Sequence, residues 1–305
     1  MNKIPYLIED NTKSSLLNYI NHHHEEINLL LENHGAILLR GFKIFSLSDF
    51  QRLSEKVCNE LFIYKYGSSP RNKLGGNIYT STEYPAEHFI PLHNENSYRT
   101  SWPKKILFCC MATPDSGGET PIANNFAVFD SLSKEIIEEF TRKKVIYVRN
   151  YGLGLDLTWQ KSFDTEDKTE VETFCQSHEI EYEWLPGGIL RTKQICQAVL
   201  QEEKTKKWGW FNQAHLFHES ANPLDLKKYL LDTYQSIELP RNSFFGDGSH
   251  ISSEYIQAIN AAYEKVKIEF PWQKNDLLIL DNEVYSHGRN SFTGPQRKIV
   301  VAMGN

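Results

Sequence analysis

Apolar residues along the chain fall into short unbroken runs and into helical repeats, which together predict a mixed fold. Unbroken apolar runs bounded by turn residues predict buried strands at 36–42, 105–114, 275–282 and 298–303. Apolar residues at helical spacing predict helices over 13–33, 47–62, 128–143 and 255–267. Between the last two strands, the polar segment YSHGRNSFTGPQ (285–296) reads as a turn-rich connection.

The order of these elements predicts the domain organisation. Strand segments lie early and late in the chain, and a region of mixed short strands, turns and aromatic clusters separates them. We therefore expect residues 1–305 to form a single domain, a β core that carries helices, with an insertion of mixed structure at roughly 145–250. The chain is long enough to bury a sizeable core.

Composition narrows the class of protein. A net charge of −6 argues against a general nucleic-acid binder. The longest apolar run, ILFCCMA at 106–112, is too short to cross a bilayer, and MNKIPYLIEDN lacks the apolar core of a signal peptide. Five cysteines without a C-x-x-C pair predict reduced thiols and a cytoplasmic protein.

The segment PLHNENSY (91–98) contains a histidine and a glutamate two residues apart, His93 and Glu95. In a strand these side chains would share one side and could bind one metal ion. Composition alone gives about 1.4 chance occurrences of H-x-[DE]. The pattern occurs three times, and the copies within HHHEE (22–26) fall in a predicted helix, where a solvated charged face explains them. Context must therefore decide for His93 and Glu95.

A ferrous iron site for oxygen chemistry needs two histidines, one carboxylate and open coordination positions. His287 is the candidate for the second histidine, because it follows an apolar strand and precedes Gly288, which permits close backbone approach. Arg297 opens the strand RKIVVAM. A buried arginine needs an anion, and its two-pronged guanidinium suits a carboxylate.

Several motifs resemble one known family. DNEVYSHGRNSFTGPQRKIVVAM is similar to the C-terminal signature of the TauD/TfdA-like Fe(II)- and 2-oxoglutarate-dependent dioxygenases, and LHNENSY followed by ATPDSGGETPIA resembles their front half. Four further segments resemble a SyrP-like branch of this family and occur in the same order as in that branch: VRNYGLGLDLTWQKSF, YEWLPGGILRT, WGWFNQAHLFH and LPRNSFFGDGSHI. The resemblance covers roughly residues 35–303.

The resemblance implies a mainly β fold with α elements, a double-stranded β-helix (jelly roll) core with helical insertions. It implies that His93, Glu95 and His287 bind Fe(II), and that Thr120 and Arg297 bind the 2-oxoglutarate carboxylate. The larger family often has aspartate where Glu95 stands. Gln296 is one residue more than the branch pattern has, which leaves the anchor open between Arg297 and Lys298. We predict Arg297, because lysine offers only a point charge.

Candidate substrate-binding residues are less specific. Two arginines could pair with a substrate carboxylate and three consecutive residues could line its pocket, although each could equally be structural: Arg191, Arg289, Trp210, Phe211 and Asn212. His215 and His218 could share a helix face, but no acidic or cysteine cluster completes a second metal site there. The basic run 204–207 reads as a solvated face.

The expected activity is oxidation of an unactivated C–H bond, with O2 and 2-oxoglutarate as co-substrates. The resemblance points to hydroxylation of an amino acid, free or held on a carrier protein, in specialised-metabolite biosynthesis. Desaturation or another radical outcome stays open. Halogenation is disfavoured, because Glu95 fills the position that a halide would take. A cupin-like binding protein without 2-oxoglutarate turnover is the remaining alternative, and it leaves Thr120 and Arg297 without a purpose.

Overall fold

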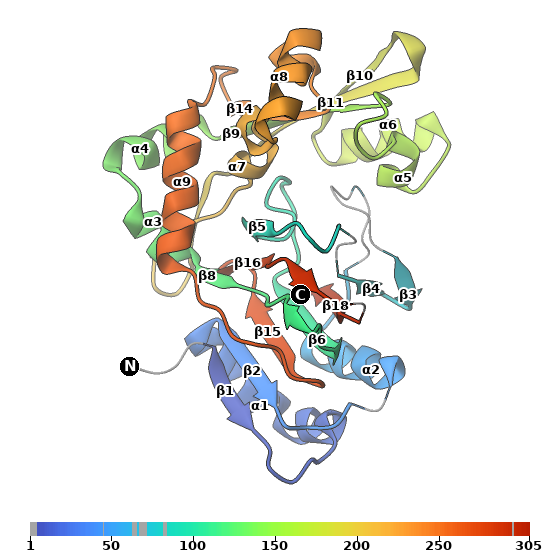
Figure 1. Cartoon of the computed structure of the whole chain (residues 1–305), viewed down its shortest axis with the longest axis vertical. Helices are drawn as coiled ribbons and strands as arrows, with labels where there is room; N and C mark the ends of the chain where they lie inside the picture. Colours follow the sequence, from blue (N-terminus) through green and yellow to red (C-terminus); the bar gives the residue numbers. More distant parts are fainter. Residues whose placement is uncertain (1–4, 45, 63–65, 67–71, 82–83, 295) are drawn as a thin grey trace.

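The computed structural model describes residues 5–44, 46–62, 66, 72–81, 84–294 and 296–305, and a seven-stranded sheet forms its base (Figure 1). In spatial order its strands are β1 (Tyr6–Glu9), β2 (Ala36–Arg40), β15 (Leu277–Asp281), β6 (Lys105–Ala112), β18 (Lys298–Gly304), β4 (Ile78–Thr80) and β3 (Lys73–Gly75). The four predicted strands are neighbours at the centre of this sheet.

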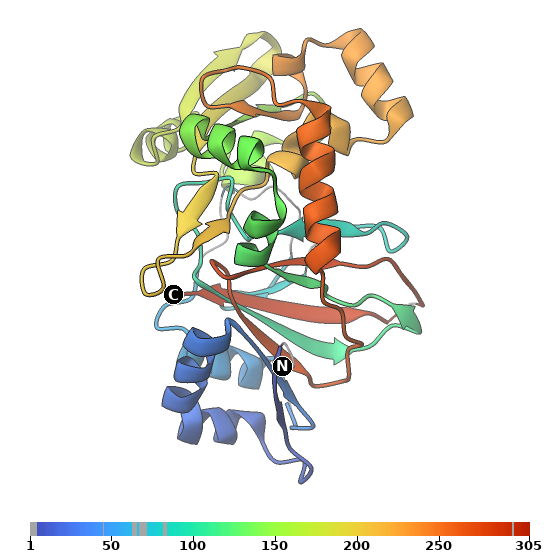
Figure 2. The same cartoon turned by 90° about the vertical axis from the view of Figure 1, so that its left-hand side faces the viewer.

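Two N-terminal helices, α1 (Leu16–His34) and α2 (Leu47–Val57), cover one face of the sheet (Figure 2). A serine side chain caps each at its start, Ser15 for α1 and Ser46 for α2. Gly35 ends α1 in the left-handed conformation that glycine adopts without strain. α2 ends at Val57, earlier than the predicted 62, and the next residue to return to the sheet is Leu61, which bridges to Gly304.

Strand β6 explains why the central strands read as unbroken apolar runs. Leu107 and Cys109 face the helices, whereas Ile106, Phe108 and Cys110 face the opposite side. Because both faces of the sheet are covered, both sets of alternating side chains are buried, and the strand shows no polar alternation.

A second sheet covers the other face and closes the β core. It has three strands, in the order β5 (Ile90–His93), β16 (Tyr285–Arg289) and β8 (Ile122–Asn124). Two facing sheets of this kind form the jelly roll, so the predicted fold class is confirmed. The expected turn-rich connection at 285–296 is wrong for 285–289, which form the middle strand of this sheet. His287 and Arg289 line the cavity between the sheets, and Ser286 donates to the Ala123 carbonyl, so the strand buries polar residues and no apolar pattern marks it.

Residues 125–266, called the inserted region below, form the upper part of the molecule in both views (Figures 1 and 2). Its four-stranded sheet has the order β10 (Glu181–Leu185), β11 (Ile189–Cys196), β9 (Val145–Tyr151) and β14 (Arg241–Phe245). Its helices are α3 (Asn125–Ser131), α4 (Lys134–Lys143), α5 (Trp159–Phe163), α6 (Lys168–Ser177), α7 (Ala214–Phe217), α8 (Leu224–Thr233) and α9 (Ser253–Val266). The helix predicted at 128–143 is two helices, because Ser133 caps a new one.

Short elements complete the chain. The two-stranded pairs are β7 (Ser116–Gly117) with β17 (Phe292–Thr293), and β12 (Val199–Gln201) with β13 (Trp208–Trp210). The 3-10 turns are η1 (Pro186–Gly188), η2 (Glu219–Ala221) and η3 (Ser236–Glu238). All five cysteines are buried as free thiols, as predicted. Among the described residues, no helix has the length and apolar character needed to cross a membrane.

Candidate metal centre

The second sheet brings together the three predicted metal ligands. His93 ends β5 and pairs directly with His287 on β16. Glu95 lies in the turn that follows β5, so the expectation that both front ligands sit on one strand holds only for His93. Segments almost two hundred residues apart in the chain thus meet at one point.

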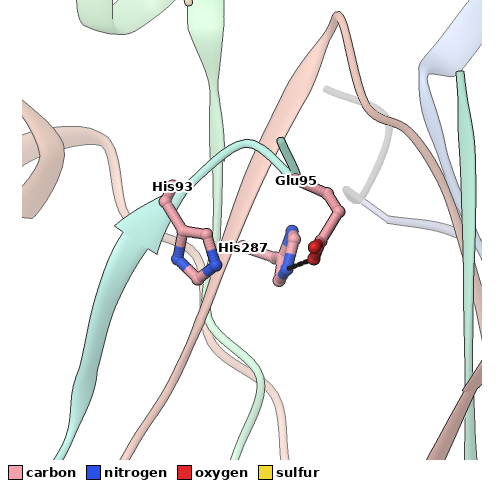
Figure 3. Close-up of side chains that lie close together, drawn as sticks. All are labelled: His93, Glu95 and His287. Atoms are coloured by element: carbon pink, nitrogen blue, oxygen red, sulfur yellow. Dashed lines mark ion pairs between the residues drawn. The ribbon is translucent and has the colours of Figure 1, made fainter. Parts of the chain in front are cut away.

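The three side chains converge closely enough to hold one ion (Figure 3). Their candidate ligand atoms all lie within 4.8 Å of one another. His287 Nε2 is 3.8 Å from Glu95 Oε2, and the two imidazole rings are 4.7 Å apart between centroids. Two imidazoles and one carboxylate on one side of a site form the donor set of ferrous oxygenases. The residues therefore fit Fe(II). Within the described ranges no other group of three or more His, Cys, Asp or Glu side chains could do so.

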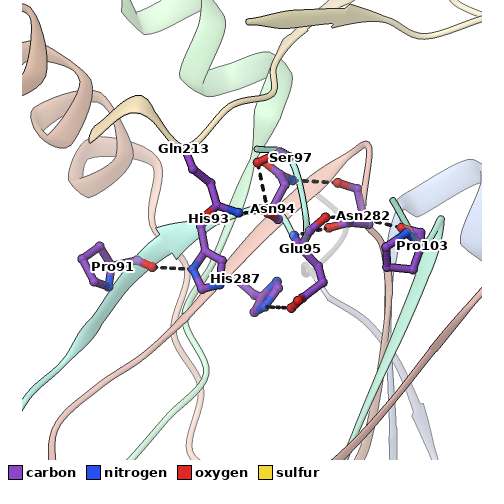
Figure 4. Close-up of polar contacts among 9 residues, drawn as sticks. All are labelled: Pro91, His93, Asn94, Glu95, Ser97, Pro103, Gln213, Asn282 and His287. Atoms are coloured by element: carbon purple, nitrogen blue, oxygen red, sulfur yellow. Dashed lines mark hydrogen bonds and ion pairs between the residues drawn. The ribbon is translucent and has the colours of Figure 1, made fainter. Parts of the chain in front are cut away.

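The orientation of the His93 ring follows from its second nitrogen. His93 Nδ1 donates a hydrogen bond to the Pro91 carbonyl oxygen, 2.8 Å away (Figure 4). A carbonyl oxygen can only accept, so Nδ1 carries the proton and Nε2 presents its lone pair. A backbone carbonyl that fixes the tautomer is the usual partner of a metal-binding histidine.

Glu95 is held through its main chain by Asn282. The Glu95 N–H donates to Asn282 Oδ1 at 2.8 Å, and Asn282 Nδ2 donates to the Glu95 carbonyl at 3.0 Å (Figure 4). Asn282 also donates to the Pro103 carbonyl at 2.9 Å, and its own carbonyl accepts from Asn94 Nδ2 at 2.6 Å. Sequence reasoning missed Asn282. The signal was a polar residue at the end of the apolar run LLILD, a position that a buried site uses.

A cavity lies beside the histidines, between the two sheets. Its walls are Ser81, Ile90, His93, Phe108, Thr120, His287, Gly288, Arg289, Arg297 and Ile299. The seven-stranded sheet supplies Phe108 and Ile299, and the three-stranded sheet supplies the histidines. The cavity is thus shared by the two histidine ligands and both residues that the resemblance assigns to 2-oxoglutarate, Thr120 and Arg297.

Arg297 lies at this cavity and Lys298 does not. The Arg297 Nε donates to the Gly118 carbonyl at 2.8 Å, while Lys298 is exposed. Burial, and then the nearby charge of Arg289, lower the pKa of Arg297 to about 10. The side chain is therefore still cationic at neutral pH, and it presents a positive charge to any ligand in the cavity.

Thr120 is buried, and its hydroxyl has a fixed hydrogen-bonding role. Trp272 Nε1 donates to Thr120 Oγ1 at 3.2 Å. Because the indole N–H can only donate, the Thr120 oxygen acts as acceptor in this bond and its own hydrogen stays available. Trp272 was not predicted from sequence, since a lone tryptophan before a strand is not distinctive.

Arg289 is committed to the chain rather than to a ligand. Its Nη1 and Nη2 atoms donate to the carbonyl oxygens of Tyr84, Pro85 and His88 at 2.6–2.8 Å. It lines the cavity but holds the segment 84–88 in place. Gly288, next to it, has no room for a side chain, because a Cβ there would lie 2.6 Å from the Ile90 carbonyl oxygen. The close approach expected of this glycine is therefore present.

The other substrate candidates do not line the cavity. Trp210 packs against Phe140 and Phe211 against Trp102, each with ring centroids 4.9 Å apart. The remaining two are hydrogen-bonded within the inserted region. Asn212 donates to Ala198 O at 2.8 Å and Arg191 donates to Asn150 Oδ1, also at 2.8 Å. Burial in the core is the role that the structure gives to 210–212.

The two other histidine patterns also have structural partners. His215 Nε2 donates to the Leu92 carbonyl at 2.9 Å, and burial lowers the pKa of His215 to about 4, so the ring is neutral. His218 Nε2 donates to the Ile251 carbonyl at 3.0 Å. His23, in the helical H-x-E copies, is exposed and pairs with Glu26 at 3.0 Å.

Comparisons with known proteins agree with this geometry. Residues 10–303 match the family described as taurine catabolism dioxygenase TauD, TfdA family. The dapdiamide synthesis protein DdaC of Enterobacter agglomerans is 41% identical over 280 residues, which cover 92% of this chain and 85% of DdaC.

Solved structures share the fold at low sequence identity. PvcB, described as an Fe, α-ketoglutarate dependent oxygenase from an isonitrile synthetic pathway, has a TM-score of 0.53 and 16% identity, covering 97% of this chain and 84% of PvcB. An asparagine oxygenase solved with Fe(II), 2S,3S-3-hydroxyasparagine and succinate has a TM-score of 0.56 and 11% identity, covering 95% and 78% of the two chains.

Proposed function

Because the chain belongs to the TauD/TfdA family of dioxygenases, we propose that it is an Fe(II)- and 2-oxoglutarate-dependent oxygenase that hydroxylates a C–H bond of an amino-acid-like small molecule. One observation carries the proposal. The two histidines that converge with Glu95 line a cavity whose wall also contains the half-buried, cationic Arg297. The ferrous ion and 2-oxoglutarate, when bound, supply the oxidising chemistry, with decarboxylation of the co-substrate to succinate and CO2.

The side chains divide the work between metal and co-substrate. His93, Glu95 and His287 would hold the ion, each through one donor atom, and three protein ligands leave a ferrous ion able to bind a co-substrate. Arg297 and Thr120 would donate hydrogen bonds to the distal carboxylate of 2-oxoglutarate, the first from its charged guanidinium and the second from its hydroxyl. This pairing would neutralise the positive charge of Arg297, whose partial burial is costly without an anion.

Apolar side chains form part of the cavity wall and would limit the access of water once ligands fill it. Phe108 lies 5.0 Å from the His287 ring between centroids, and Ile90 and Ile299 complete the apolar lining. Excluding water strengthens the electrostatic attraction between Arg297 and a bound carboxylate. It also favours oxidation of the substrate over loss of the oxidising equivalents to solvent.

Buried amides beside Glu95 support a polar substrate. Both side-chain polar atoms of Asn96, and Asn94 Oδ1, are buried without a hydrogen-bond partner in the described chain. A buried unpaired polar atom costs about 1–3 kcal/mol, so these atoms are suited to bind water or the polar groups of a substrate. DdaC, named for dapdiamide synthesis, and the asparagine oxygenase also favour an amino-acid-like substrate in natural-product biosynthesis.

The deciding experiment measures succinate. Protein loaded anaerobically with Fe(II) is given 2-oxoglutarate and O2, and succinate release is compared across free amino acids and amino acids held on a carrier protein. We expect release that rises strongly with one group of these compounds, together with a hydroxylated product. Binding of 2-oxoglutarate without any turnover would contradict the proposal and favour a cupin-like binding protein. A desaturated product would keep the oxygenase class and change the outcome of the reaction.

A further inference from the structure

The peptide unit between Asn94 and Glu95 is held at both of its ends. Its carbonyl oxygen accepts a hydrogen bond from Gln213 Nε2 at 2.7 Å (Figure 4). Its N–H donates to Asn282 Oδ1 at 2.8 Å. Asn282 belongs to the β core, whereas Gln213 belongs to the inserted region, between β13 and α7. One peptide unit next to a candidate metal ligand is therefore hydrogen-bonded at its two ends by two different parts of the fold.

These hydrogen bonds act on Glu95 through covalent geometry. The peptide unit is planar and rigid, so fixing its carbonyl oxygen and its N–H fixes the orientation of the whole plane. That plane sets the direction of the N–Cα bond of Glu95 and therefore the position of Cα, the atom that carries the carboxylate side chain. The same carbonyl oxygen also accepts longer hydrogen bonds from Ser97 Oγ at 3.1 Å and from the Ser97 N–H at 3.3 Å, both within the turn itself. Gln213 supplies the shortest of the three bonds and the one that comes from outside the turn. Its loss would therefore leave the plane less tightly held and let the Glu95 carboxylate shift relative to His287.

Gln213 is itself firmly placed. Its side chain is buried, and its main-chain N–H donates to the Tyr147 hydroxyl oxygen on β9 at 2.7 Å. Two residues on, His215 Nε2 donates to the Leu92 carbonyl at 2.9 Å. The inserted region thus donates hydrogen bonds to the carbonyls on both sides of His93, at residues 92 and 94.

We propose that Gln213 is a positioning residue for the metal centre, and that the inserted region sets metal affinity by holding the peptide unit 94–95. The inference rests on the proposed function, since it assumes that Glu95 is a metal ligand. Side chains that orient metal ligands from outside typically change metal affinity by about 10–100-fold when removed.

The chain offers a matched control. Gln197 is also in the inserted region, and its Nε2 donates to the carbonyls of Ser97 and Arg99 at 2.9 and 3.1 Å. It therefore ties the same segment to the inserted region by the same type of bond, but beyond the two ligands. Loss of Gln197 should weaken docking of the insertion without freeing the peptide unit 94–95.

The test uses Co(II) as the probe and the full-length protein. Gln213→Met and Gln197→Met keep side-chain length but remove the donor. The Co(II) dissociation constant and the visible absorption of bound Co(II), which reports ligand geometry, are measured alongside urea unfolding of the metal-free proteins. We expect Gln213→Met to weaken Co(II) binding by about 10–100-fold and to change the spectrum. Gln197→Met should lower stability while leaving both metal readouts as in wild type.

Three results would overturn the inference. The first is wild-type affinity and spectrum in Gln213→Met. The second is an equal loss of metal affinity in both variants, which would assign the effect to general docking of the insertion. The third is failure of the wild-type chain to bind Co(II), which would contradict the proposed function as well. If Gln213→Met does not fold, Tyr147→Phe is measured instead. It removes the acceptor of the Gln213 N–H, so weakened Co(II) binding with a changed spectrum supports the inference, and unchanged binding overturns it.

Discussion

At the residue scale, two of the polar side chains that line the cavity are the candidates for 2-oxoglutarate binding, Arg297 and Thr120. Arg297 Nε lies 2.8 Å from the Gly118 carbonyl oxygen, and the half-buried side chain lines the cavity. Thr120 has its oxygen occupied by Trp272. The two groups are both donors, which is the combination that a carboxylate requires.

Replacing Arg297 should remove most of the affinity for 2-oxoglutarate. Truncating one partner of a buried, hydrogen-bonded charge pair costs about 2–5 kcal/mol, roughly a thirty- to several-thousand-fold rise in dissociation constant. The measurement is an anaerobic titration of Fe(II)-loaded Arg297→Gln with 2-oxoglutarate. Lys298→Gln is the control, because Lys298 is adjacent in sequence and exposed. The reverse ranking of the two variants would make Lys298 the anchor.

Replacing Trp272 should weaken the same site more mildly. Trp272→Phe keeps the ring but removes the N–H that donates to Thr120, so the hydroxyl is free to turn away from the co-substrate. A net hydrogen bond is worth about 0.5–1.5 kcal/mol, or about a two- to tenfold rise in the 2-oxoglutarate dissociation constant. Trp184→Phe is the matched control, because its indole donates to Glu172 in the inserted region at 2.8 Å.

A double variant separates positioning from general damage. If Trp272 acts through the Thr120 hydroxyl, Trp272→Phe should add little to the loss already caused by Thr120→Val. Fully additive losses would show that Trp272 influences the cavity by another route. The residue-level predictions that sequence could make concern side chains in recognisable motifs, whereas partners such as Trp272 become visible only when the fold brings distant segments together.

At the scale of elements, the contact between β5 and β16 holds the metal centre together. His93 and His287 are paired directly across these strands, and the register shifts between His287 and Arg289. Gly288 sits within this shift, and its missing side chain lets β16 approach the Ile90 carbonyl. The strand pair thus depends on one position that accepts no side chain.

Gly288→Ala should therefore disturb both stability and metal binding. The added Cβ would meet backbone at 2.6 Å, and overpacking of this kind costs about 1–3 kcal/mol of unfolding free energy. Urea unfolding of the metal-free protein and Co(II) affinity are the two measurements. Gly209→Ala in β13 is the control, since its new Cβ would meet only side-chain atoms, at 3.3–3.4 Å. Wild-type stability of Gly288→Ala would contradict the packing argument.

The pattern of predicted and missed elements has one physical cause. Strands β2, β6, β15 and β18 were predicted because both of their faces are buried, which leaves unbroken apolar runs. β16 was missed because three of its five buried residues are polar, Ser286, His287 and Arg289, so its sequence YSHGR resembles that of a loop. The strand that contains the candidate ligand His287 is therefore the one that its hydrophobic pattern does not predict. The prediction of one helix at 128–143 missed the break before Ser133, which caps α4, and the earlier start of α3 at Asn125.

At the scale of the whole molecule, the inserted region and the β core meet at the metal-binding segment. The core contributes His287 and Asn282, while the insertion contributes donors to the carbonyls of residues 92, 94, 97 and 99. The sequence indicated the candidate ligands, because family motifs contain them. It did not indicate these hydrogen bonds from the inserted region to the main chain around the ligands. Main-chain carbonyls leave no signature in a sequence. The substrate candidates at 210–212 are buried and do not line the cavity, which a run of aromatic and amide residues could not reveal.

The central claim is that His93, Glu95 and His287 hold one ferrous ion that recruits 2-oxoglutarate. The direct measurement is an anaerobic equilibrium titration with Fe(II), in the presence of 2-oxoglutarate, of wild type and of the His93→Ala, Glu95→Ala and His287→Ala variants. We predict one ion per wild-type chain and a loss of affinity of at least about a hundredfold in each variant, the upper end of what outer partners alone produce. His23→Ala and His24→Ala, from the helical H-x-E copies, should bind as wild type. Full Fe(II) and 2-oxoglutarate binding by His287→Ala would contradict the account.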